Sequence, residues 1–202
     1  MVVRVVEIRR QRGKGMADKN IGLMAHLMRR VGFGASYKEL EDRVAKGYEN
    51  TVEELLEPSA HGIPAIDESI MMRYMPSLVR AINIPFYAQG NWMYRLIGTP
   101  RPLEEKVVLF WHHVFATGAS KVDNCNQMTV QMDLFRRYGM GNYRDLLFEL
   151  AKNPAMIFWL DNLDNHKTSP NENWSRELLE LFSMGQGNYS EKDVLECARA
   201  FT

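Results

Sequence analysis

Two carboxylates and a histidine pair are the side chains of this sequence best suited to hold a metal ion. Glu177 and Glu180 are three residues apart, and His112 and His113 are adjacent. Imidazole and carboxylate groups are common ligands of zinc, iron and copper. Neighbouring residues of a helix point about 100° apart, so only one histidine of the pair can face a given ion. The sequence therefore offers a candidate metal site in which His112 joins Glu177 and Glu180 from another helix.

This metal hypothesis has a structural alternative. The Glu-x-x-His signature of di-iron helices is absent, and Glu177 with Glu180 also fits the polar edge of a packed helix. A histidine hydrogen-bonded in or beside the core would account for His112 equally well. The residues leave a divalent metal cofactor open, and the sequence favours the interpretation in which these side chains have structural roles.

Polar side chains are concentrated between residues 161 and 176. Six of them are candidates for one shared polar pocket: Asp161, Asn162, Asn165, Asn171, Asn173 and Arg176. The loop that begins this segment is rich in oxygen atoms, but it lacks the alternating ligand positions and the glycine of an EF-hand. Turns made by Asn and Asp side chains explain such a composition equally well. The sequence predicts that these six residues cluster, and it assigns no reaction to them.

The elements that must position these residues are helices. Ser169 and Glu172 have the spacing of a capping box, which predicts a helix over residues 170–184. We expect Arg176 to pair with Glu180 one turn later in this helix. The candidate metal site therefore depends on how this helix packs against the helix of the histidine pair.

Apolar residues recur at helical spacing along most of the chain. A capping box at Ser36 with a stop at Gly47, and a second box at Thr51, mark two helix starts. Prolines divide residues 59–85 into short helical pieces and loops. The expected longer helices cover residues 20–31, 36–46, 51–57, 86–96, 103–115, 127–138, 143–151, 154–160, 170–184 and 191–202. The sequence predicts an all-α, multi-helix globular array of roughly eight to ten helices with short loops.

Composition and charge restrict the class of protein. With 202 residues, of which 46% are apolar and 25% charged, we expect a single α-helical domain over residues 20–202. Residues 1–19 are expected to form a flexible basic tail without an export signal, which indicates a cytoplasmic location. The 25 basic and 25 acidic residues cancel, which argues against nucleic acid as a partner. No run approaches the roughly 18 apolar residues of a membrane span.

Several segments resemble successive blocks of a bacterial protein family, the domain of unknown function 1800. They are "LMAHLMRRVGFGAS", "RPLEEKVVLFWHHVFATGASKV", "LFRRYGMGNYRDLLFELAKNPAMIFWLDN", "PNENWSRELLELFSMGQGNY" and "DVLECARAFT". The blocks occur in the family's order from about Ile21 to Thr202. Its polar block is matched by Asp161, Asn162, Asn165 and Asn171.

The resemblance implies a predominantly helical protein whose relatives are often exported. It also implies a separately encoded partner from a second uncharacterised family that resembles alkaline-phosphatase-like proteins. Similar proteins usually continue after the closing "ARAFT" with Gly-Trp and a long further region. We therefore expect residues 20–202 to be the amino-terminal portion of a longer family domain.

Two functional hypotheses follow. The first is a non-catalytic scaffold or protein-interaction module that serves the phosphatase-like partner. The alternative is a metal-dependent enzyme, of hydrolase or oxidase type, that uses His112, Glu177 and Glu180. The enzyme requires these three side chains to converge around a cavity, whereas the scaffold predicts separated side chains and a broad exposed apolar patch.

Overall fold

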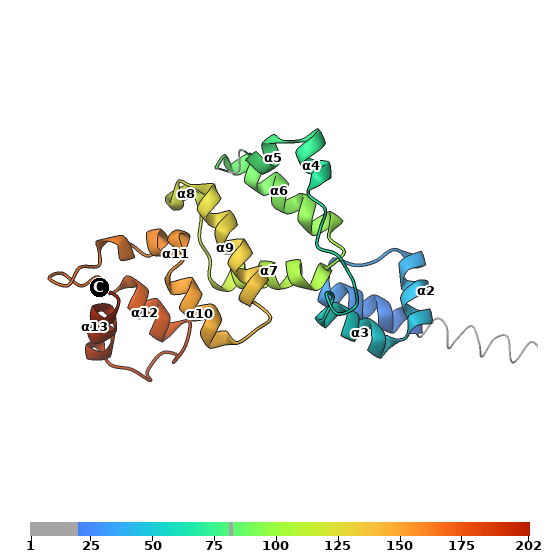
Figure 1. Ribbon diagram of the computed structural model, residues 1–202. Coiled ribbons are helices and arrows are strands. Elements are labelled where there is room, and N and C mark those ends of the chain that lie inside the picture. The colour runs from blue at the N-terminus through green and yellow to red at the C-terminus, as the bar shows by residue number, and fades with distance from the viewer. Residues whose placement is uncertain (1–19, 81–82) are drawn as a thin grey trace, which may run out of the picture.

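Helices make up the regular structure of this chain (Figure 1). The computed structural model describes residues 20–80 and 83–202, and the basic tail expected at residues 1–19 lies outside this part. Within the described residues, strand-like pairing is limited to one isolated bridge between His166 and Ser169. The predicted all-α fold class is confirmed.

The helix boundaries agree with most of those expected. In chain order the elements are residues 20–31, α2 (Tyr37–Lys46), α3 (Tyr48–Leu56), α4 (Ser69–Tyr74), α5 (Ser77–Arg80), α6 (Pro85–Gly98), α7 (Pro102–Val114), α8 (Ala119–Val122), α9 (Cys125–Tyr138), α10 (Tyr143–Ala151), α11 (Pro154–Trp159), the 3-10 turn η1 (Asn162–Asp164), α12 (Asn173–Glu180) and α13 (Glu191–Ala200). Nine of the helices in the described part have seven or more residues, which fits the expected eight to ten.

Residues 20–31, α2 and α3 pack together at one end of the molecule (Figure 1). Ser36 caps α2, because its hydroxyl accepts the Glu39 N–H at 3.2 Å. Gly47 ends α2 with φ 103°, a conformation that favours glycine. The buried members of this small cluster are Met24, Leu27, Met28, Leu40 and Leu55. Both predicted ends of α2 are therefore confirmed.

The predicted helix start at Thr51 is wrong. The third helix begins at Tyr48, immediately after Gly47, so Thr51 lies inside it. The Thr51 side chain is fully buried, and its hydroxyl donates to the Gly47 carbonyl at 2.8 Å. This bond to the preceding turn lets a threonine sit in a buried helix face, where the spacing resembles a cap.

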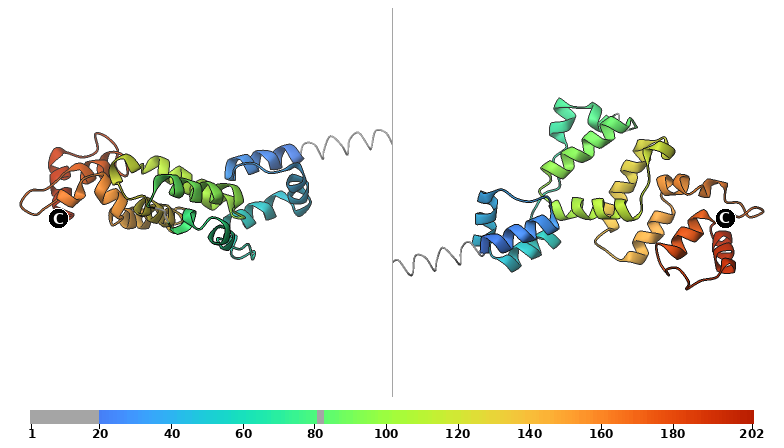
Figure 2. Two further views of the ribbon diagram at one scale, coloured as in Figure 1. Left: turned by 90° about the horizontal axis from the view of Figure 1, so that it is seen from above. Right: turned by 180° about the vertical axis from the view of Figure 1, so that it is seen from behind.

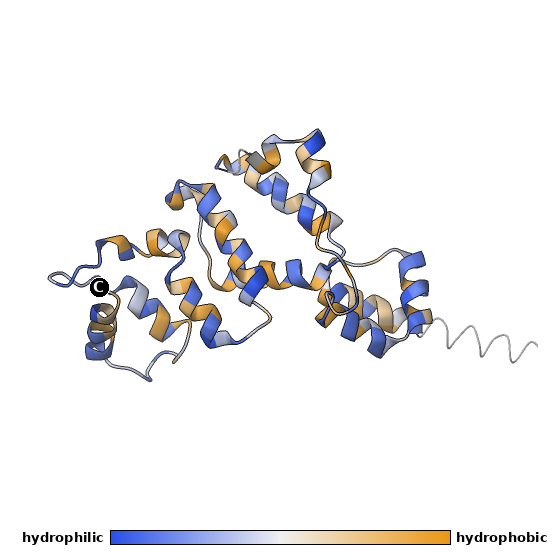
Figure 3. Ribbon diagram, viewed as in Figure 1, coloured by the Kyte–Doolittle hydropathy of each residue, from blue (hydrophilic) through white to orange (hydrophobic). Residues whose placement is uncertain are grey.

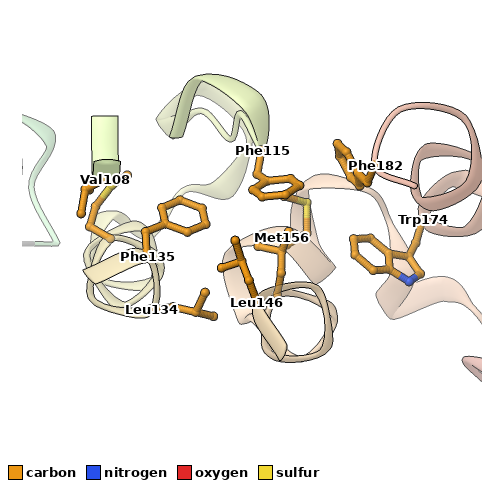
Figure 4. Packing of buried hydrophobic residues seen from close by; sticks show 10 residues of the cluster. Val108, Phe115, Leu134, Phe135, Leu146, Met156, Trp174 and Phe182 are labelled. Carbon is orange, nitrogen blue, oxygen red and sulfur yellow. The ribbon is translucent and has the colours of Figure 1, made fainter. Parts of the chain in front are cut away.

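A larger hydrophobic cluster connects α7, α9, α10, α11 and α12 (Figure 4). Phe115, just after α7, lies near its centre with its ring stacked on Trp111 at a centroid distance of 5.3 Å. The ring of Phe182 meets Phe115 edge to face at 4.9 Å, and Figure 4 shows the two side chains pointing toward each other. This cluster includes helices from the walls of both concave sites described below.

The predicted capping box at Ser169 is wrong, because α12 begins only at Asn173. Ser169 closes a turn with His166 instead, and its N–H donates to the His166 carbonyl at 2.9 Å. Glu172 makes no side-chain cap bond. The Asn171 side chain accepts the Asn173 N–H at 3.0 Å and so satisfies one free donor of the first turn.

The molecule is elongated and thin, as the views in Figures 1 and 2 show. The small cluster lies at one end, and α12 with α13 lies at the other. Helix α7 connects the two clusters, because Leu103 packs against the small one and Val108 is buried in the large one. Across the described residues, we find no helix with both the length and the apolar character that crossing a membrane requires.

Candidate functional site

Two of the asparagines predicted to share a pocket, Asn165 and Asn171, hold backbone segments together. Asn165 is buried, and its amide nitrogen donates to the Ala198 carbonyl of α13 at 2.9 Å. Its amide oxygen accepts the Asn171 N–H at 2.9 Å, and Asn171 in turn accepts the N–H of Asn173. These bonds join the loop after η1 to the ends of two helices. They give Asn165 and Asn171 a structural role.

Asp161 and its neighbours form the second part of this polar group. The Asp161 carboxylate lies 2.7 Å from the Lys121 ammonium and accepts a bond of 3.4 Å from the Asn173 amide. Its backbone is left-handed, with φ 55°. The side-chain oxygen of Asn162 is buried without a hydrogen-bond partner among the described residues. That these residues share a ligand pocket stays a prediction.

Arg176 connects α12 to α13. Its guanidinium bonds to Glu172 at 3.0 Å and to Glu191 at 2.7 Å. The hydrogen bond from Arg176 is the main cause that lowers the pKa of the Glu191 carboxyl. The predicted pair of Arg176 with Glu180 is wrong, because Arg176 reaches toward α13 and Glu180 accepts a hydrogen bond from the Tyr189 hydroxyl at 3.0 Å.

The candidate metal ligands do not form a group. His112 lies on α7 against the Trp92 ring, with 5.4 Å between ring centroids, while Glu177 and Glu180 lie on α12. Among the residues that the structure describes, no three His, Cys, Asp or Glu side chains are arranged to hold a metal ion. The geometry therefore gives no support to a shared site of His112, Glu177 and Glu180.

A cavity of about 280 Å³ lies beside His112, where α6, α7, α8 and α9 meet. Its walls combine aromatic, sulfur-containing and polar side chains. They include Trp92, His112, Cys125, Met128 and Arg136. None of the six polar residues predicted to cluster between positions 161 and 176 lines this cavity.

A buried ion pair fixes one wall of this cavity. Arg136 donates to both carboxylate oxygens of Glu105, at 2.7 and 3.0 Å, and also bonds to Asp133 at 2.7 Å. The Trp92 indole N–H donates to Glu105 at 3.2 Å. Burial lowers the pKa of Arg136, but its bonds and attraction to Glu105 and Asp133 outweigh burial and leave the pKa raised. The signal in the sequence was an acidic residue on an apolar helix, which requires a cationic partner when buried.

His112 lies two helical turns after Glu105 on α7 and packs against the same Trp92 ring. Burial lowers the pKa of its imidazole below the ordinary value. Its Nδ1 atom is inaccessible to solvent and has no hydrogen-bond partner among the described residues. A neutral imidazole with one unpaired nitrogen is therefore the state that lines the cavity near pH 7.

An apolar groove of about 660 Å³ lies between α10, α12 and the end of α13. Apolar side chains line most of it: Tyr143, Leu147, Phe148, Ala151, Trp174, Leu178, Ala200 and Phe201. Trp174 is only 2% exposed, whereas Phe148 is 61% exposed. Among the described residues that line the groove, the charged ones are Arg144 and Lys152, both basic. Figure 3 shows hydrophobic residues along α10 on this part of the molecule.

Comparison with known proteins gives one match. No curated protein and no solved structure matches the chain. The family model described as a protein of unknown function (DUF1800) matches residues 26–202, which is most of the chain. This range contains both the cavity and the groove. Because the match covers most of the chain, the chain belongs to the DUF1800 family.

Proposed function

We propose that this protein is a non-catalytic scaffold that binds another protein through the groove between α10, α12 and α13. The occupant is an amphipathic helix of a separately encoded protein, with acidic residues beside its apolar stripe. The observation that carries the proposal is an apolar groove whose charged lining residues, in the described part, are both basic. Large apolar surfaces with polar edges mark protein interaction sites.

The side chains that line the groove range from buried to exposed. Trp174 forms a buried base, Leu178 is half-buried, and Phe148 stands exposed on the wall formed by α10. Apolar anchors of a helix at spacings of three and four residues fill a groove of this kind. An exposed phenylalanine next to a buried tryptophan offers such anchors both a wall and a base.

The basic residues of the groove favour a partner that carries negative charge. Lys152 bonds to Glu149 at 2.7 Å, and its ammonium lies 5.1 Å from the centroid of the Phe148 ring. Arg144 has no ion pair among the described residues, so its charge is available to a partner. Acidic residues on the edge of an incoming helix that faces α10 would meet Arg144 and Lys152. Charge complementarity of this kind favours one partner over others.

The family resemblance supplies a class of partner. Relatives are often encoded beside phosphatase-like proteins, so acidic amphipathic helices of such a protein are the natural candidates for the groove. The competing hypothesis of a metal-dependent enzyme has no converging ligand group among the described residues to favour it.

A synthetic helical peptide tests the proposal. The probe carries leucine and phenylalanine on one face and glutamate on both edges of that face, and fluorescence anisotropy follows its binding to the purified protein. Phe148→Ser should weaken binding by about tenfold or more, because a bound helix would bury this ring.

Phe86→Ser is the matched control. Phe86 is 73% exposed on α6, which does not line the groove, so this variant should bind the peptide as the wild type does. Equal losses in both variants, or a peptide that does not bind the wild type, would refute the groove as the docking site.

A further inference from the structure

The cavity beside His112 is separate from the groove and has the features of a small-molecule site. We propose that it binds a small, uncharged aromatic heterocycle that presents one hydrogen-bond acceptor to His112. This inference does not depend on the proposed docking of a partner helix, because none of the groove residues lines the cavity.

The size and walls of the cavity favour a flat ring. Its volume of about 280 Å³ is near the lower end of ligand pockets and suits one ring or two fused rings. Trp92 provides an aromatic surface, and Met128 and Met132 provide polarizable sulfur atoms that contact aromatic rings favourably. An aliphatic chain would use neither feature.

His112 supplies the hydrogen bond. Its Nδ1 atom is buried without a partner, and a buried N–H without an acceptor is rarer and costlier than an unpaired acceptor. The proton of the neutral imidazole therefore belongs on Nε2. Since His112 lines the cavity and Nδ1 is closed off, Nε2–H is the donor left for a ligand.

Other deep donors of the cavity are already used. The Thr117 hydroxyl donates to the Gln131 side chain at 2.7 Å, and the Thr129 hydroxyl donates to the Cys125 carbonyl at 3.2 Å. The Asn91 amide donates to the Leu78 carbonyl at 3.0 Å. With these side chains bonded within the protein, we assign the ligand's acceptor to His112.

The charges of the cavity favour an uncharged ligand. Arg136 is its one lining side chain with a full charge among the described residues, and two carboxylates, those of Glu105 and Asp133, already neutralise it. An anion would meet these carboxylates close behind Arg136. A cation would find no acidic side chain on the described walls.

Quinoline and naphthalene are the probes for this proposal. The two molecules have the same fused rings, but only quinoline has a ring nitrogen that accepts a hydrogen bond, and it is uncharged near neutral pH. Binding is measured by NMR titration, with the Trp92 indole and His112 imidazole signals as reporters. Wild-type protein should bind quinoline about fivefold more tightly than naphthalene.

Variants locate the hydrogen bond. His112→Phe should abolish the preference for quinoline while naphthalene still binds, and His113→Phe, at the exposed neighbour, should retain the preference. Phe148→Ser, which changes the groove, should leave both affinities unchanged. Trp92→Ala should weaken both ligands, because it removes the aromatic wall.

Three results would overturn the proposal. They are the absence of binding by quinoline, a preference for quinoline that survives His112→Phe, and tighter binding of benzoate or benzamidine than of quinoline to the wild type. The comparison of quinoline, naphthalene and the two charged ligands uses wild-type protein alone, so it decides the matter even if His112→Phe does not fold.

Discussion

The carboxylate of Glu105 holds Arg136 in the cavity wall. Glu105 is 3% exposed, and it accepts bonds from both Arg136 and Trp92. Glu105→Ala should lower the free energy of unfolding by roughly 3–5 kcal/mol, because Arg136 would remain buried without its main partner. Urea unfolding followed by circular dichroism measures this loss.

A double variant distinguishes the loss of the whole ion pair from the effect of leaving one buried charge unpaired. Replacing both members with apolar residues, as Glu105→Leu with Arg136→Met, should recover most of the lost stability, since no buried charge would then be unpaired. A double variant as unstable as Glu105→Ala would contradict this account of the wall.

His112 should make stability depend on pH. Burial lowers its pKa in the folded state, so the unfolded state takes up a proton at a higher pH than the folded state does. Its contribution to stability is therefore complete above the ordinary histidine pKa of about 6.5 and is lost as the pH falls below that value.

The measurement compares the wild type with His112→Gln by urea unfolding between about pH 7.5 and pH 5.5. The wild type should lose more stability over this range than His112→Gln, while His113→Gln should follow the wild type. Equal pH dependence in the wild type and His112→Gln would show that His112 is not held neutral by burial.

Residue types were easier to predict than their partners. The sequence marks His112 as a residue at or beside the core, and the structure places it half-buried against Trp92. It could not reveal that Arg136, 31 positions from Glu105, completes the wall, because this contact depends on how α7 packs against α9. The wrong pairing of Arg176 has the same cause, since its partner Glu191 lies on another helix.

At the scale of elements, capping residues, glycines and prolines in the sequence predicted the ends of several helices correctly. Ser36 and Gly47 bound α2 as expected, and Pro85 and Pro102 each occupy the first position of a helix. The signal failed at Ser169, where a turn with His166 uses the backbone groups that a cap would have satisfied. Capping spacing alone cannot distinguish these cases.

The start of α13 offers a direct test of capping. Ser190 and Asp193 form a reciprocal capping box, in which each side chain accepts the other's backbone N–H. Ser190→Ala should lower the free energy of unfolding by about 1 kcal/mol. Ser169→Ala is the control and should change stability little, because Ser169 caps no helix. A larger loss at Ser169 than at Ser190 would reverse the assignment of the two caps.

At the scale of the whole molecule, α7 joins two hydrophobic clusters, and we expect them to unfold together. All four tryptophans of the chain belong to the larger cluster or pack against it. Tryptophan fluorescence therefore reports on that cluster, whereas far-ultraviolet circular dichroism reports on all helices. The two transitions in urea should coincide. A circular dichroism transition that begins earlier would show that residues 20–31, α2 and α3 unfold separately.

The sequence led us to expect an exposed apolar patch, but it could not show where such a patch would lie. A scaffold was expected to carry an exposed apolar patch, and the helices that line the groove were each predicted from the sequence. The packing of these three helices against one another was not predicted. Residues from Tyr143 to Phe201 form the groove only after α10, α12 and α13 pack together. The apolar character of α10 on its own also fits an ordinary buried helix face.

Exchange of the groove's charges tests the central claim of a docking site most directly. The measurement is the affinity of two helical peptides with the same apolar face, one with glutamate edges and one with lysine edges, for the wild type and for Arg144→Glu with Lys152→Glu. The wild type should prefer the glutamate peptide by about threefold to tenfold, and the double variant should prefer the lysine peptide. Binding of neither peptide, or the same preference in both proteins, would contradict the proposal that this groove receives an acidic amphipathic helix.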